Sequence, residues 1–138
     1  MCPFTILDHP ADIGIEARGA TLPEAFEQAA AGMMSIIVDP STVGKKEARV
    51  IDVAGSDHEQ ILVRWLSELL YQYDGRGFVG REFCVEQLTP LFLRASVQGE
   101  TFDPERHATR LDVKAVTYHQ VAVEENAGGA VVRVYFDI

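Results

Sequence analysis

The amino-acid sequence predicts an α+β fold, a two-layer sandwich with two amphipathic helices packed on one face of a largely antiparallel β-sheet. Two segments in the first half repeat apolar residues at helical spacing, and the segment over residues 56–75 is the more apolar of the two. Much of the second half alternates apolar and polar residues, which is the period of a strand with one buried face. With no internal repeat or linker, residues 1–138 are expected to form a single domain.

The segment over residues 56–75 predicts the helix around which the rest of the chain is organised. Ser56 and Glu59 have the spacing of a capping box, and Gly75 stands where a helix commonly ends. One broad apolar face is expected from Leu62, Trp65, Leu66, Leu69, Leu70 and Tyr73. Helical periodicity alone accounts for these aromatic residues, so we expect them in the core rather than at a cofactor.

The first quarter of the chain predicts a hairpin followed by a helix. Phe4–Leu7 is a short apolar run, and Asp12–Arg18 alternates between apolar and polar residues. Thr21 and Glu24 form a second possible capping box. The helix that follows should end before Pro40, because proline disfavours helical geometry in the residue that precedes it, here Asp39.

One strand is expected before the central helix, at Glu47–Ala54, and a meander of about five strands after it. The expected apolar positions of the meander run over Phe83–Leu88, Leu91–Val97, Leu111–Ala115, Val121–Val123 and Val132–Phe136. Glycines at positions 75, 77 and 80 predict a loop between helix and meander. This loop lacks the Gly-Lys-Ser/Thr of a phosphate-binding loop.

Composition excludes several classes of function. The formal net charge of −9 argues against strong direct nucleic-acid binding, which requires a basic surface, but it suits cations or a basic protein partner. Two cysteines are too few for a disulfide framework. The sequence has neither the pattern of a signal peptide nor an apolar stretch long enough for a membrane span. We therefore expect a soluble, cytoplasmic protein with no membrane partner.

No catalytic nucleophile is evident, and the four histidines are scattered. Gly-x-Ser-x-Gly is absent, and neither cysteine has a neighbour that would activate it. None of the histidine pairs has the spacing of a helical zinc motif. Each histidine is therefore expected to be a surface or structural residue.

The acidic residues at the two ends of the chain are more suggestive. Asp8 and Asp12 flank a tight turn, and the sequence closes with Asp137 and the main-chain carboxylate of Ile138. Carboxylate oxygens suit calcium, magnesium or manganese rather than zinc. The sequence alone does not bring Asp12 and Asp137 together, so solvated carboxylates at strand ends remain the alternative interpretation.

Five motifs, in order along nearly the whole chain, resemble the archease family. They are Asp8-His9-x-Ala11-Asp12-Ile13-Gly14, Trp65-Leu66-Ser67-Glu68-Leu69-Leu70, Gly99-Glu100-x-x-Asp103-Pro104-Glu105-Arg106-His107, Val113-Lys114-Ala115-Val116-Thr117-Tyr118-His119 and Phe136-Asp137-Ile138. Pro10 departs from the pattern, because the family commonly has threonine at this position. Any contact made by that hydroxyl group or by its backbone N–H would be lost here.

The resemblance implies a small α+β protein that is not itself an enzyme. Archeases are accessory proteins of the RtcB-type RNA ligase, which joins RNA ends in tRNA splicing with GTP and a divalent metal. They speed guanylylation of the ligase and allow multiple turnover. The resemblance also implies a divalent cation, described as calcium in the family, with magnesium or manganese as alternatives. Its ligands map onto Asp12, Asp137 and Ile138.

Two other functions remain open from the sequence. One is a small metal-dependent hydrolase that uses Asp8, His9, Asp12 and His119. The other is an interaction scaffold that binds no metal. An assay of the isolated protein on phosphoesters separates the first from an archease, and a cation titration separates the second.

Overall fold

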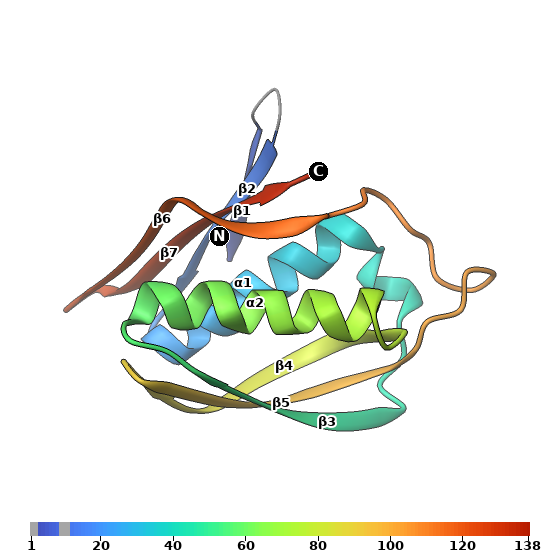
Figure 1. The fold of residues 1–138 in the computed structure, drawn as a ribbon, viewed down its shortest axis with the longest axis horizontal. Helices are drawn as coiled ribbons and strands as arrows, with labels where there is room; N and C mark the ends of the chain where they lie inside the picture. The colour runs from blue at the N-terminus through green and yellow to red at the C-terminus, as the bar shows by residue number, and fades with distance from the viewer. Residues whose placement is uncertain (1–2, 9–11) are drawn as a thin grey trace.

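The computed structural model describes residues 3–8 and 12–138 (Figure 1). In this part of the chain the elements are β1 (Phe4–Asp8), β2 (Asp12–Gly19), α1 (Leu22–Ile37), the short 3₁₀ helix η1 (Pro40–Thr42), β3 (Glu47–Ala54), α2 (His58–Asp74), β4 (Phe78–Thr89), β5 (Phe92–Thr101), β6 (Ala115–Asn126) and β7 (Gly129–Asp137). No helix among the described residues is long and apolar enough to cross a membrane.

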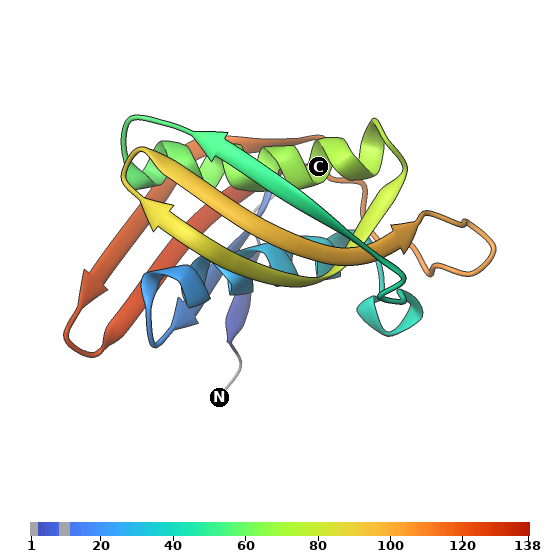
Figure 2. The same ribbon diagram turned by 90° about the horizontal axis from the view of Figure 1, so that it is seen from below.

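The strands form two antiparallel sheets, and both helices lie between them (Figures 1 and 2). One sheet has the order β1-β2-β7-β6 and the other the order β3-β5-β4. The predicted α+β class, the antiparallel pairing and the two amphipathic helices are confirmed. The prediction of one sheet with the helices on one face is wrong, because each helix is covered on two sides.

Helix α1 explains why a single sheet would not suffice. It packs on β2 of one sheet and on β4 of the other. Its buried residues surround most of the helix, and they are Leu22, Ala25, Phe26, Ala29, Ala30, Gly32, Met33, Met34, Ile36 and Ile37. A helix that is apolar nearly all round must be covered on opposite sides. The predicted cap is confirmed, since Thr21 Oγ1 accepts a hydrogen bond from the N–H of Glu24 at 3.3 Å.

Helix α2 begins one residue later than its predicted cap. Asp57, rather than Ser56, is the N-cap and accepts a hydrogen bond from the N–H of Gln60 at 2.8 Å. Gln60 Oε1 in turn accepts the N–H of Ser56 at 2.8 Å, so the reciprocal pattern of a capping box is shifted by one position. The predicted core face is confirmed, with Trp65 fully buried and Leu69 only 3% exposed.

The strand predicted over Leu111–Ala115 is wrong. Strand β6 begins only at Ala115 and includes the segment that was predicted as a separate strand over Val121–Val123. The stretch before it bonds to the end of α1, where the N–H of Leu111 donates to the carbonyl of Ile36 at 3.0 Å. Buried Val113 and half-exposed Leu111 imitate the alternation of a strand although this backbone pairs with a helix end.

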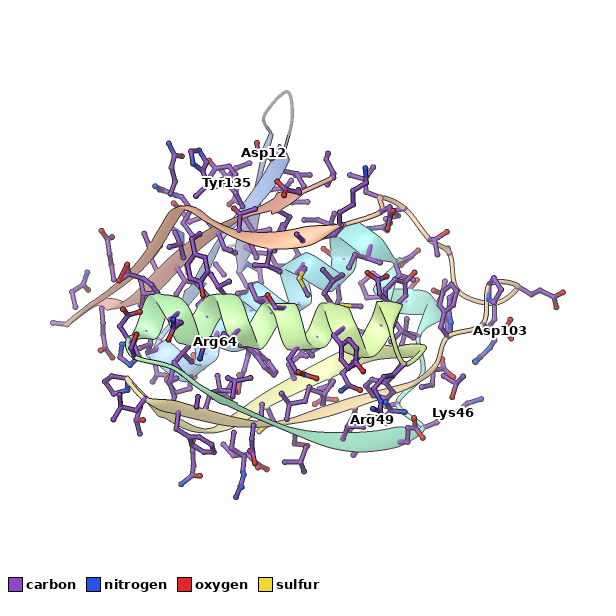
Figure 3. All side chains as sticks on the ribbon, viewed as in Figure 1. Asp12, Lys46, Arg49, Arg64, Asp103 and Tyr135 are labelled. Carbon is purple, nitrogen blue, oxygen red and sulfur yellow. The ribbon has the colours of Figure 1, made fainter. Side chains whose placement is uncertain are left out.

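A buried carboxylate, Glu100, ties the end of β5 to two connecting segments. It accepts hydrogen bonds from Arg106 Nη2 at 2.7 Å and from the backbone N–H of Gly44. Lys46 Nζ lies 3.7 Å from the same carboxylate, and Lys46 and Asp103 mark this end of the molecule in Figure 3. These bonds, led by that from Arg106, lower the pKa of Glu100 to about 2.

His107 completes this network, and its two ring contacts define which nitrogen carries the proton. Its Nδ1 accepts a hydrogen bond from the N–H of Asp103 at 2.9 Å, so Nδ1 carries no proton. Its Nε2, 2.9 Å from Glu100 Oε2, must therefore be the N–H that donates to the carboxylate. The network is structural, which agrees with the expectation for a histidine in this chain.

Replacing Leu69 with alanine should lower the free energy of unfolding by about 2–5 kcal/mol, because it leaves a cavity in the core. Urea unfolding measures this loss. Ser67→Ala, at an exposed position of the same helix, should change stability by less than about 0.5 kcal/mol and serves as the control. A loss for Leu69→Ala as small as that of the control would mean that α2 packs with another face inward.

Glu100 should make the fold sensitive to acid. The pKa of this carboxyl is lowered to about 2 in the folded protein from an ordinary value near 4.5. Its contribution to stability is therefore complete above about pH 4.5 and disappears as the pH falls towards about 2. The stability difference between wild type and Glu100→Gln, measured by urea unfolding at a series of pH values, should shrink over this range. A constant difference would contradict the role of the ionised carboxylate, and exposed Glu105→Gln is the control.

Candidate metal centre

Pairing between the first and last parts of the chain places two carboxylates opposite each other. In the antiparallel register of β2 and β7, Asp12 is the partner of Asp137. Directly opposite residues have Cβ atoms about 4.5–5.5 Å apart. Ile138 follows directly and is 41% exposed. The end of β7 lies beside β2 in Figure 1, so the structure brings together the carboxylates that the sequence alone could not.

The apolar pattern of both strands puts these carboxylates on the outer face of the sheet. Ile13 and Ile15 of β2 are buried, as are Val134 and Phe136 of β7. Because side chains alternate along a strand, the residues between them face away from the helices. A slip of one residue would expose the apolar set, so the core fixes the register that pairs the carboxylates.

Further along the same face the two strands pair opposite charges. Glu16 of β2 lies opposite Arg133 of β7, and Arg133 Nη2 donates to Glu16 Oε2 at 2.7 Å. This hydrogen bond lowers the pKa of Glu16, with burial opposing it and Arg18 assisting. The pair formed by Asp12 and Asp137 is different, because like charges directly opposite in a sheet repel each other. A cation between them would relieve that repulsion.

The available donors fit a hard divalent cation. Asp12 and Asp137 both offer carboxylate oxygens, which are the ligands of calcium, magnesium and manganese. Within the described part of the chain, no group of three or more His, Cys, Asp and Glu side chains is arranged to hold a metal ion. From the described residues alone, further ligands would be main-chain oxygen or water, and the third carboxylate of the predicted set, that of Ile138, belongs to the main chain.

The hydrolase residues are only partly described. His9 lies outside the described residues, as do the side chain of Asp8 and the departure at Pro10. The backbone of Asp8 pairs with Ile13. His119 lies on β6, where its ring meets that of Tyr135 edge to face, with 6.1 Å between centroids. The His119 ring therefore packs against an aromatic ring, and its backbone N–H donates to the Thr117 hydroxyl at 3.3 Å.

Sequence reasoning missed two residues beside the carboxylates, Gly14 and Tyr135. They are partners in the register between β2 and β7, two pairs along from Asp12 and Asp137, and so form the next pair on the same face of the sheet. Tyr135 is only 7% exposed although alternation puts it on the outer face. A glycine among residues with high strand propensity was the available signal, because such a glycine often marks close approach of another group.

A family model and individual relatives of known family both match this chain, and they name the same family. Residues 4–138 match the Archease protein family (MTH1598/TM1083). The chain is 40% identical to protein archease of Sulfolobus acidocaldarius over all of both chains. It is 42% identical to that of Pyrococcus abyssi over 88% of each.

Solved structures agree with the sequence comparison. The solution structure of Methanobacterium thermoautotrophicum protein 1598 matches over all of both chains with a TM-score of 0.86 and 34% identity. An archease from Thermotoga maritima, described as a possible chaperone, has the same fold, with a TM-score of 0.68 and 17% identity over 96% of this chain and 94% of that one. On this evidence the chain belongs to the archease family.

Proposed function

We propose that this protein is an accessory factor that activates an RtcB-type, GTP-dependent RNA ligase in tRNA splicing. It would speed guanylylation of the ligase and allow multiple turnover, acting in the cytoplasm. The cation would be held by Asp12, Asp137 and the main-chain carboxylate of Ile138. The observation that carries the proposal is the register that sets Asp12 opposite Asp137. Membership of the archease family supports the choice of partner.

An accessory role fits what the relatives and the composition suggest. The Thermotoga maritima relative is described as a possible chaperone, which is an activity exerted on another protein. The net charge of −9 disfavours a direct grip on RNA and suits a basic surface on a protein partner. In this proposal the ligase binds the RNA, and the accessory protein binds the ligase. The hydrolase alternative is not favoured by any of these observations.

The cation would stabilise the start of β2 and the end of β7, where Asp12 and Asp137 are paired. Removing the repulsion between Asp12 and Asp137 would stabilise their strand ends in one arrangement. Calcium suits the site best, because it accepts six to eight oxygen ligands in flexible geometry and water can complete its shell. The face that carries the cation is then the surface we propose for contact with the ligase.

A tag appended after Ile138 should weaken calcium binding. The added residues convert the main-chain carboxylate into a peptide group, which removes one charge from the site. Calorimetry should show a lower calcium affinity for the C-terminally tagged protein than for the N-terminally tagged one, because ligand charge sets affinity. Equal affinities would exclude the terminal carboxylate as an important ligand.

Asp12→Asn and Asp137→Asn should fold but fail to restore multiple turnover to the ligase. Each substitution removes one charge while nearly preserving shape, so it lowers cation affinity with little effect on packing. The assay contains excess tRNA halves over an RtcB-type ligase, at limiting calcium. Asp52→Asn removes the same charge from the outer face of the other sheet and is the matched control.

Full stimulation by both Asn variants at limiting calcium would show that these carboxylates are not the functional site. Wild-type protein without ligase should neither join nor cleave the RNA. Cleavage that follows the protein through purification and is lost in Asp12→Asn would instead support the hydrolase.

A further inference from the structure

Tyr135 is more buried than its position in the sheet explains. It lies on the outer face of β7, between Arg133 and Asp137, on the same side as both candidate carboxylates. Arg133 and Asp137 are exposed, yet Tyr135 is only 7% exposed. Residues two apart on a strand are about 6.6–6.8 Å apart, so the tyrosine adjoins the carboxylate pair. Figure 3 shows Asp12 and Tyr135 in the same corner of the molecule.

Gly14 provides the space that this ring occupies. A Cβ atom added to Gly14 would lie 2.7 Å from Tyr135 Cδ1 and 2.8 Å from Cε1. No side chain larger than hydrogen fits at position 14 while the ring stays in place. The tyrosine therefore reaches across from β7 and lies over the backbone of β2 at Gly14, two residues from Asp12.

Strand β6 supports the other side of Tyr135. Regular pairing between β6 and β7 is interrupted between Thr117 and Ala122, and Gln120 has a φ of +52°. Such irregularities re-aim a side chain. The His119 ring meets Tyr135 edge to face, and the Thr117 hydroxyl donates to the carbonyl of Tyr135 at 3.0 Å.

We infer that Tyr135 is a positioning residue of the cation site, with Gly14 and His119 as its two supports. This inference rests on the proposed cation site. The ring forms an apolar wall across β2 and β7, which limits the movement of the neighbouring carboxylates and excludes water on that side. Less water strengthens the attraction between carboxylate and cation. The apolar surroundings of a metal site control solvent access, and loss of outer-shell groups typically costs about 10–100-fold in metal affinity, which we take as the scale of the effect.

The test is calcium calorimetry on three variants that keep every carboxylate. Tyr135→Val removes the ring and suits a strand. Gly14→Ala displaces the ring by adding one methyl group. The double variant, Gly14→Ala with Tyr135→Val, has no ring and therefore no clash with one. The tightest remaining contact of the new Cβ atom is with the carbonyl oxygen of Val134 at 3.0 Å, so we expect this variant to fold even if Gly14→Ala does not. All three should bind calcium about 10–100-fold more weakly than wild type when folded.

Gly80→Ala is the matched control. A Cβ atom there would lie 2.9 Å from the Phe83 ring, so the substitution disturbs a similar contact between glycine and an aromatic residue in the other sheet. It should lower the melting temperature yet leave calcium affinity within about twofold of wild type, as distant sites do not couple. This control separates positioning from general loss of stability.

Two outcomes would overturn the inference. One is a folded Tyr135→Val or double variant that binds calcium as tightly as wild type. The other is Gly80→Ala weakening binding as much as Tyr135→Val does. Wild-type protein that binds no calcium would instead contradict the proposed cation site itself, so the two failures are distinguishable.

Discussion

The antiparallel register between β2 and β7 is the constraint on which the rest of this structure depends. It joins the two ends of the chain, and it is fixed because Ile13, Ile15, Val134 and Phe136 must all face the helices. The same alternation sends acidic and aromatic side chains to the outer face. The pairing of the two candidate carboxylates is thus a consequence of core packing.

Two kinds of interaction stabilise the fold around this register. One is apolar burial, because α1 is enclosed between the two sheets. At the far end of the molecule, Glu100 joins three segments through Arg106, His107 and Gly44. A buried carboxylate is tolerated there because each of its oxygens accepts a hydrogen bond. The two adjacent like charges lie on the outer face of β2 and β7, whose inner face packs on the core.

Local features of the fold were predictable from the sequence, whereas long-range ones were not. Helical periodicity found both helices, and Glu47–Ala54 has the predicted bounds. Periodicity does not say which sheet a strand joins, so the second sheet was missed. Alternation also misled over Leu111–Ala115, where the backbone bonds to a helix end. The acidic pattern at the two ends of the sequence suggested a cation site, and the family resemblance implied Asp12, Asp137 and Ile138 as its ligands, but only strand pairing brings Asp12 and Asp137 together.

The central claim is that Asp12 and Asp137 hold the same cation, and a double-mutant cycle of calcium affinity tests it most directly. Calorimetry would be performed on wild type, Asp12→Asn, Asp137→Asn and the double variant. If both carboxylates bind one ion, the effects are not additive and the coupling should be about 0.5–3 kcal/mol. Additive losses, or wild-type protein that binds no calcium, would contradict the claim.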